Sequence, residues 1–268
     1  MRELLVIGIG AGDPDQVTVQ AIKAMNRADT FFIIGKGDEK QALVDLRTGI
    51  LDEHVHLDYK VVEITDPPRD RTPTDYEGVV EDWHERRAAK FEAEFAAEPG
   101  VGAILVWGDP SLYDSTLRIV ERVLARGKVS FDYSVIPGIT SVQSLAAQHR
   151  IVLNRIGEPI HITTGRKLAE GLPDGVDNAV VMLDAHCTFT QVSEDEAEIW
   201  WGAYLGTSDE ELISGNLREV EDRIVARRAE LREARLDHGY VPPSALTTGR
   251  GLHIRSCALE PRRRSAHL

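Results

Sequence analysis

The sequence predicts an α/β protein with two domains, and three observations support this prediction. An apolar run, a glycine turn, a helical repeat and a second apolar run follow one another within about 35 residues, which is the order of a βαβ unit. Apolar runs then alternate with amphipathic segments as far as Pro137, where the pattern changes. We therefore expect α/β domains over residues 1–137 and 138–236, followed by an atypical tail over 237–268.

The first domain is predicted to alternate strands and helices. Leu4–Ile7 is a continuous apolar run that ends in glycine, which is typical of a buried parallel strand. The helix that follows, over 18–28, has Val19, Ile22 and Met25 in one stripe. The later elements expected here are strands over 30–34, 61–64, 102–107 and 130–136 and helices over 41–51, 75–97 and 114–126.

The second domain has fewer clear elements. Helices are expected over 141–148 and 224–235, and strands over 160–163, 179–183 and 200–205. Residues 237–268 carry five arginines against two acidic residues and are rich in turn-forming residues. We expect this basic tail to be poorly ordered and to carry no chemistry.

Composition excludes several classes of partner. The formal net charge of −13 argues against nucleic acid, which needs a basic face, and a polyanionic substrate would need a locally basic trough. No apolar run approaches the roughly 18 residues of a membrane helix, and no signal-peptide pattern precedes the first strand. Cys187 and Cys257 are too few for a metal set or a disulfide framework. We expect a cytoplasmic protein without a metal.

Four glycine-bearing turns end apolar runs and together indicate one small-molecule site. They are IGIGAGDP at 7–14, VWGDP at 106–110, VIPGITS at 135–141 and YLGTS at 204–208. The first resembles a dinucleotide fingerprint, but its spacing is G-x-G-x-G, and the second strand ends in Gly35-Lys36-Gly37 without an acidic ribose ligand. A nicotinamide dehydrogenase and a bare strand-to-helix turn are therefore alternatives. We favour a turn that faces a different ligand.

The four segments in this order resemble the tetrapyrrole methylase family. GIGAGDPDQVTVQAIKAMNRAD is similar to the family's N-terminal signature, with Ala11 in place of the usual proline. WGDPSLYDST resembles the family's G-D-P loop, VIPGITSVQSLAA its P-G-x-T/S-S helix start, and YLGTSDEEL its late L-G-T-S segment. The resemblance covers about residues 3 to 235, but the tail does not match the family's usual final strand.

The resemblance implies two α/β domains with a cleft between them for S-adenosylmethionine. Carried over by position, the cofactor-binding residues are Ala11, Gly108, Asp109, Leu112, Thr140, Ser141, Leu183, Gly206 and Thr207. Their chemistry agrees, because glycines allow close approach of the backbone, an apolar flank suits adenine, and a carboxylate suits a sulfonium or an amine. A type I turn is the alternative interpretation of Asp109–Pro110.

Longer blocks, among them DPPRDR at 66–71, resemble the branch of the family that acts in cobalamin biosynthesis on precorrin-5. The implied reaction methylates carbon 1 and releases acetate, so a general base for water is expected. We assign Asp13 to that role, with Lys36 as a partner for a carboxylate or a carbonyl. Asp13 is alternatively a helix N-cap, and Lys36 a solvated loop residue.

The substrate is expected to be a small-molecule tetrapyrrole with several carboxylates. Candidate partners for these carboxylates are Arg47, Arg69, Arg71, Arg155, Arg166 and Lys167, each alternatively a surface charge. His186 follows a strand end and is a further candidate for the cleft. The resemblance also implies a homodimer. A precorrin methylase that releases no acetate and a non-catalytic carrier remain alternative functions.

Overall fold

The computed structural model describes residues 1–35, 41–67, 76–192, 197–236, 244–245 and 253–257. The chain divides into two compact units. Unit 1 comprises residues 1–10 and 14–139, and unit 2 comprises residues 11–13 and 140–268. The first glycine turn therefore contributes residues to both units.

Unit 1 contains a five-stranded parallel sheet in the order β3-β2-β4-β1-β5. Its strands are β1 (Glu3–Gly8), β2 (Thr30–Gly35), β3 (Lys60–Thr65), β4 (Val101–Val106) and β5 (Asp132–Ile136). Its helices are η1 (Pro14–Gln16), α1 (Val19–Met25), α2 (Gln41–His54), α3 (Tyr76–Ala97) and α4 (Thr116–Ala125). Every strand and helix expected in the first domain is present, with ends that differ by up to three residues.

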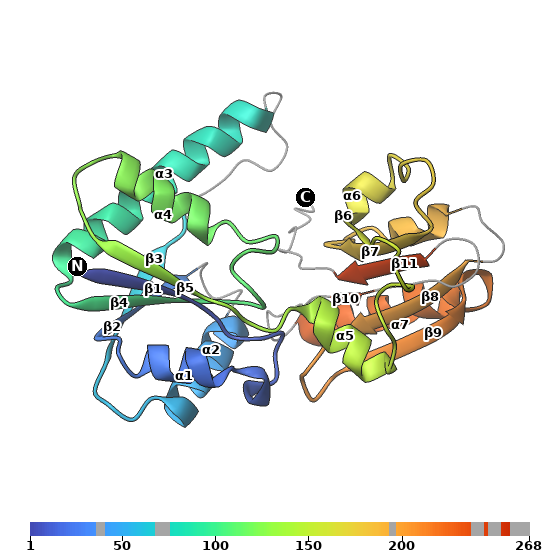
Figure 1. Ribbon diagram of the computed structural model, residues 1–268, viewed down its shortest axis with the longest axis horizontal. Helices are drawn as coiled ribbons and strands as arrows, with labels where there is room; N and C mark the ends of the chain where they lie inside the picture. The colour runs from blue at the N-terminus through green and yellow to red at the C-terminus, as the bar shows by residue number, and fades with distance from the viewer. Residues whose placement is uncertain (36–40, 68–75, 193–196, 237–243, 246–252, 258–268) are drawn as a thin grey trace, which may run out of the picture. The chain divides into compact units, whose positions relative to one another are not determined.

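The chain changes direction once across this sheet, which places helices on both faces. From β1 it passes to β2 and then β3, and α1 and α2 cover one face. From β3 it returns to β4 and β5, and α3 and α4 cover the other face (Figure 1). Right-handed crossovers require this change of face. Unit 1 is therefore a doubly wound sheet, and the α/β class that the sequence predicted is confirmed.

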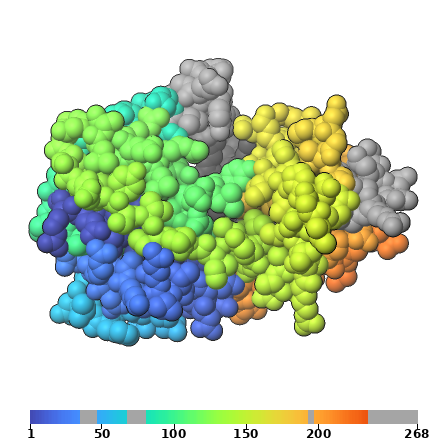
Figure 2. Space-filling model, in the orientation of Figure 1, coloured from blue at the N-terminus to red at the C-terminus, as the bar shows by residue number. Residues whose placement is uncertain are grey.

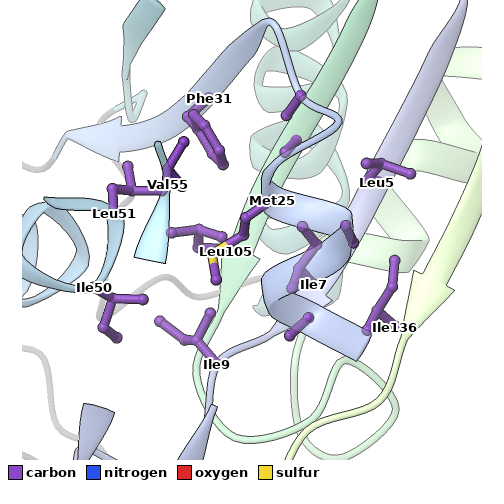
Figure 3. Close-up of a cluster of buried hydrophobic side chains, with 14 of the residues drawn as sticks. Leu5, Ile7, Ile9, Met25, Phe31, Ile50, Leu51, Val55, Leu105 and Ile136 are labelled. Atoms are coloured by element: carbon purple, nitrogen blue, oxygen red, sulfur yellow. The ribbon is translucent and has the colours of Figure 1, made fainter. Parts of the chain in front are cut away.

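Alternate side chains of β1 fill the two cores. Leu5 and Ile7 pack under α1 and α2 (Figure 3), whereas Leu4 and Val6 pack under α3 and α4. All four side chains are fully buried, and each such burial stabilises the fold by roughly 1.5–3 kcal/mol. This two-sided burial explains why the strand is a continuous apolar run.

β5 forms one edge of the sheet and is largely exposed. Four of its five residues, 132–135, are exposed, and the lime-green surface of this segment is uncovered on the face drawn in Figure 2. Tyr133 and Val135 are 39% and 42% exposed. The strand therefore contributes its backbone to the sheet but little to the cores.

Unit 2 contains a mixed sheet in the order β10-β8-β11-β7-β6, with β9 paired to β8. Its strands are β6 (His161–Thr164), β7 (Asn178–Met182), β8 (Glu198–Ala203), β9 (Glu211–Asn216), β10 (Ser244–Ala245) and β11 (His253–Cys257). Its helices are α5 (Ser141–His149), α6 (Gly165–Leu168), η3 (Thr188–Gln191) and α7 (Leu217–Leu236). In Figure 1, α6 lies above this sheet and α5 below it.

Unit 2 differs from the sequence prediction at several places, and its short helices α6 and η3 were not predicted. β9 was not predicted, and it makes the YLGTS segment the loop of an antiparallel β8–β9 hairpin. α7 begins at Leu217 instead of residue 224, because Asn216 accepts a hydrogen bond from the Arg218 amide. In the tail, where little order was expected, β11 pairs with both β7 and β8, and β10 pairs with β8. The rest of the 237–268 tail lies outside the described residues.

Candidate functional site

Three of the four glycine segments meet at one edge of the unit 1 sheet. β1 lies between β4 and β5, and parallel strands bring their carboxyl ends to the same edge. A Cβ atom on Gly138 would lie 2.0 Å from the Gly108 carbonyl oxygen, and one on Gly8 would lie 2.6 Å from the Gly138 nitrogen. These glycines therefore allow three backbone segments to touch one another. This role within the protein does not depend on a ligand.

Backbone hydrogen bonds hold the first glycine turn against the G-D-P loop. The Gly108 amide donates to the Gly10 carbonyl at 2.7 Å, and the Gly10 amide donates back at 3.4 Å. Gly10 and Gly108 have φ angles of 84° and 62°, a region in which a side chain is strained. The two turns are thus fixed as one backbone unit at the sheet edge.

The Asp109 carboxylate joins the G-D-P loop to the Pro137–Gly138 turn. Its Oδ2 accepts from the Gly138 amide at 2.9 Å, and its Oδ1 accepts from the Ser111 amide at 2.8 Å and from the Ser111 hydroxyl. Partial burial acts to raise the pKa of Asp109, but these hydrogen bonds outweigh it and lower the pKa below its ordinary value. Asp109 is therefore a stable anion at the sheet edge.

The loop between Asp109 and α4 is held at both ends. The Leu112 amide donates to the Asp109 carbonyl at 3.2 Å, and the Asp114 carboxylate accepts from the Thr116 amide at 2.6 Å. Between these contacts, Tyr113 has a φ angle of 52° and is 43% exposed. Leu112, which the sequence assigned to the cofactor, is half-buried in the same loop.

A buried guanidinium lies behind this loop. Arg87 of α3 is 5% exposed, forms an ion pair with Asp66 at 2.9 Å and donates to the Ser115 hydroxyl at 3.3 Å. Burial lowers the pKa of Arg87, and the charges of Asp66 and Asp114 oppose that shift. Its guanidinium also lies 4.5 Å from the centre of the Trp83 ring. The cluster connects the end of β3, α3 and the start of α4.

In unit 2, the Ala11–Asp13 segment packs on the β8–β9 hairpin loop. Gly12 has a φ angle of 155°, and a Cβ atom there would lie 2.8 Å from the Leu205 carbonyl oxygen and 3.0 Å from Cγ2 of Thr207. The Thr207 hydroxyl donates to the Tyr204 carbonyl at 2.8 Å, and the Gly206 amide donates to Glu210 at 2.8 Å. Ala11, Gly206 and Thr207 are thus brought together.

Thr140 and Ser141 begin α5, and both are buried. The Thr140 hydroxyl accepts from the Val142 amide at 3.2 Å, and the Gln143 side chain accepts from the Thr140 amide at 3.0 Å, which is a capping box. The Thr140 side chain therefore stabilises the helix start.

Bulky residues in the left-handed region follow three strands. They are Tyr113 after β4, Leu183 after β7 and Tyr204 after β8, with φ angles of 52°, 57° and 55°. This conformation costs an L-residue roughly 1–2 kcal/mol, and such strain gathers at functional sites. All three residues lie within segments or at positions that the sequence assigned to the site. Leu183 is half-buried and is followed by the buried Asp184, whose Oδ1 accepts from the Thr188 amide at 3.0 Å.

The predicted catalytic residues are only partly described. Asp13 is half-buried and precedes η1, and the N-cap of α1 is Thr18, whose hydroxyl accepts from the Ala21 amide at 3.1 Å. Thr18 therefore caps α1, whereas Asp13 directly precedes η1. Lys36, Arg69 and Arg71 lie outside the described residues.

The remaining basic candidates are described, and most have partners. The guanidinium of Arg47 lies 5.2 Å from the centre of the Trp107 ring, and its Nε donates to the Leu105 carbonyl at 3.4 Å. Arg155 forms an ion pair with Asp177, and Lys167 forms one with Glu170. His186 and Arg166 are exposed. Arg47 is the candidate that lies at the carboxyl end of β4 in unit 1.

Comparison with known proteins identifies the family. The sequence model of the tetrapyrrole (corrin/porphyrin) methylases matches residues 3–221, which is most of the chain. The chain belongs to the tetrapyrrole methylase family. A relative from Sinorhizobium sp., named precorrin-6A synthase [deacetylating], is 52% identical to this methylase over 236 residues, or 87% of this chain and 90% of the relative.

Solved structures agree with the fold of this methylase. A cobalamin-synthesis-related protein (CobF) from Corynebacterium diphtheriae is 38% identical, covers 92% of this chain and 98% of its own, and superposes with a TM-score of 0.78. The uroporphyrin-III C-methyltransferase of Thermus thermophilus is 20% identical, with 92% of each chain covered and a TM-score of 0.57, and it shows the fold alone.

Two further observations concern the described part of the methylase. Among the described residues, no group of three or more His, Cys, Asp or Glu side chains could hold a metal ion. Within the same part of the chain, none of the helices is both long and apolar enough to span a membrane. Cys187 is buried, and nothing is described of the Cys257 side chain.

The sequence did not predict the Arg87–Asp66 pair of this methylase. α3 is highly charged, so a single buried arginine has no distinct pattern within it. One signal was available, because Asp66 directly follows a strand, where a parallel sheet places its functional side chains. The packing role of Gly8, Gly108 and Gly138 was also missed, because it depends on which strands are neighbours.

Proposed function

We propose that this methylase transfers the methyl group of S-adenosylmethionine to carbon 1 of precorrin-5 and releases acetate, which gives precorrin-6A. The observation that carries the proposal is the 52% identity, over 87% of this chain and 90% of the relative, to a protein named precorrin-6A synthase [deacetylating]. The 38% identity to a cobalamin-synthesis-related protein supports the same pathway.

Residues of both units are proposed to bind S-adenosylmethionine. In unit 1 these are Gly108, Asp109 and Leu112, and in unit 2 they are Ala11, Thr140, Ser141, Leu183, Gly206 and Thr207. A family structure in complex with S-adenosylhomocysteine supports this choice of cofactor. Bound S-adenosylmethionine supplies a methyl group that its sulfonium already activates.

The described residues suit such a ligand. Asp109 is an anion with a lowered pKa, and its oxygens have lone pairs beyond those used by Gly138 and Ser111, so it can face a sulfonium or an amine. Leu183 is a half-buried apolar side chain suited to the flank of adenine, and the half-buried Leu112 is proposed to line the methionine and ribose side. The strained backbone at Leu183 fixes the direction of its side chain.

The protein's main tasks in methyl transfer are orientation and exclusion of water. The interlocked turns at Gly10, Gly108 and Gly138 provide a rigid edge for orientation. Loss of the acetyl group consumes one water, and a base must remove a proton from it. We propose Asp13 as that base and Lys36 as a partner for a substrate carboxylate or carbonyl.

The test is an assay that follows methylated pigment and acetate together, by mass spectrometry, with S-adenosylmethionine and enzymatically made precorrin-5. Equal amounts of methylated product and acetate are expected. Methylation without acetate would instead favour another precorrin methylase. Cofactor binding with no turnover would favour a carrier.

The role of Asp13 has its own test. Asp13→Asn should keep methylation and S-adenosylmethionine binding but slow acetate release at least tenfold. Wild-type acetate release in this variant would remove Asp13 from the mechanism. Asp13→Glu, which keeps a base, is the matched control and should retain part of the activity.

We also propose that the protein acts in the cytoplasm as a homodimer, as the family resemblance implies. The exposed apolar residues of the β5 edge, Tyr133 and Val135, are compatible with a covered surface in an assembly. Light scattering of the purified protein during gel filtration would give its mass in solution. A mass of one chain at micromolar concentration would contradict the dimer.

A further inference from the structure

Tyr113 is the residue of the G-D-P loop whose conformation most needs an explanation. Its φ angle of 52° is unfavourable for a bulky aromatic residue, and glycine or asparagine would adopt it at lower cost. The side chain gains little burial in return, because the residue is 43% exposed. A strained tyrosine that is this exposed is therefore a candidate for contact with a ligand.

The surrounding loop holds Tyr113 in this conformation from both sides. On the N-terminal side, Asp109 binds the Gly138 amide at 2.9 Å and the Ser111 amide at 2.8 Å. On the C-terminal side, Asp114 accepts from the Thr116 amide at 2.6 Å, and the buried Arg87 donates to Ser115 at 3.3 Å. Backbone strain persists where the neighbouring structure fixes it in this way, and such positions are enriched in ligand contacts.

The position of the loop determines what the ring can meet. The loop follows β4, the central strand of the unit 1 sheet, at the carboxyl edge where open α/β sheets bind ligands. Burial raises the pKa of the Tyr113 phenol, so the ring is neutral at neutral pH. A neutral, half-exposed aromatic ring suits a flat or weakly curved apolar face.

We propose that the Tyr113 ring contacts the face of the tetrapyrrole macrocycle and sets its position against the G-D-P loop. The inference rests on the proposed function, because that function supplies the macrocycle. The adenine of S-adenosylmethionine is the other flat ligand, but we assign its flank to Leu183 in unit 2. Tyr113 is thus a substrate-contacting residue, and its loss affects the tetrapyrrole and not the cofactor.

Substitutions of Tyr113 distinguish an effect on contact with the substrate from an effect on folding. Tyr113→Asn removes the ring but suits the left-handed backbone, so its thermal midpoint should equal or exceed that of the wild type. Its KM for precorrin-5 should rise at least tenfold, with the KM for S-adenosylmethionine unchanged. Tyr113→Phe keeps the ring and should stay within about twofold of the wild type in both constants.

Arg150→Gly is a matched control for relief of strain. Arg150 also has a positive φ angle, 56°, but it is exposed at the end of α5. The variant should gain stability and keep both KM values. An unchanged KM for precorrin-5 in Tyr113→Asn, or a raised KM for S-adenosylmethionine instead, would overturn the proposal.

A measurement of precorrin-5 binding distinguishes failure of this proposal from failure of the proposed function. Quenching of intrinsic tryptophan fluorescence by precorrin-5, with S-adenosylhomocysteine present, gives a Kd without turnover. If the wild type binds precorrin-5 but does not methylate it, the proposed function fails, while a tenfold weaker Kd in Tyr113→Asn still supports the contact. Equal Kd values in wild type and variant, or no binding by the wild type, would overturn the contact.

Discussion

Gly138→Ala tests the interlocked turns of unit 1 most directly. Gly138 does not have a positive φ angle, so the backbone accepts alanine and only the new methyl group matters. That methyl would lie 2.0 Å from the Gly108 carbonyl oxygen and 2.8 Å from the Gly8 carbonyl carbon. Both neighbours are backbone atoms of strand ends, so no flexible side chain can move aside. The turns must separate by about 1 Å to reach an acceptable contact.

The cost has two parts. Overpacking in a well-packed region costs about 1–3 kcal/mol. The same movement lengthens the 2.9 Å hydrogen bond from the Gly138 amide to the Asp109 carboxylate beyond bonding distance, and a hydrogen bond to a charged group is worth about 1.5–3 kcal/mol. We expect a loss of about 3 kcal/mol, which lowers the thermal midpoint of a chain of this size by roughly 6–12 °C.

The measurements are calorimetric unfolding and the KM for S-adenosylmethionine, which should rise because Asp109 loses its fixed position. Gly49→Ala is the matched control, because Gly49 lies in α2 and a Cβ atom there would meet nothing within 4 Å. Alanine in a helix stabilises by about 0.5–1 kcal/mol relative to glycine, so this control should shift the midpoint upwards. A Gly138→Ala protein with wild-type midpoint and wild-type KM would refute the packing argument.

Three further variants probe the same edge and its neighbours. The pKa of Asp109 is lower in the native state than the ordinary carboxyl value of about 3.9. Its contribution to stability is therefore present above that ordinary value and is lost as the pH falls through the lowered native pKa. Asp109→Asn should consequently show a smaller loss of thermal midpoint between pH 5 and pH 3 than the wild type. Arg87→Met removes the buried guanidinium that forms the ion pair with Asp66 and should cost about 3–5 kcal/mol in urea unfolding. Asp66→Asn in the same chain should restore part of this loss, and an additive double variant would contradict the pairing. Gly12→Ala places a methyl 2.8 Å from the Leu205 carbonyl and should raise the KM for S-adenosylmethionine severalfold, whereas an unchanged KM would mean that the Ala11–Asp13 segment tolerates displacement.

The sequence by itself determined the class of fold, the family and most elements of the first domain. The period of apolar residues decides these features, and this period is a local property of the sequence. β1 is apolar from Leu4 to Ile7 because both of its faces are covered there. The glycine segments were equally readable, because residue type and order suffice to recognise them. They also carry the prediction of which loops belong to the site.

Only the tertiary structure decided what individual site residues contact. Gly8, Gly108 and Gly138 pack on one another because β1 lies between β4 and β5. The period of apolar residues predicts single strands but not the order of strands in a sheet, so this packing could not be predicted from the sequence. β11 was missed for the same reason, since a short segment becomes a strand only when β7 and β8 offer it hydrogen bonds. Long-range pairing and burial also set the charge state of Asp109 and the conformation of Tyr113, and neither can be read from the residues that precede or follow them.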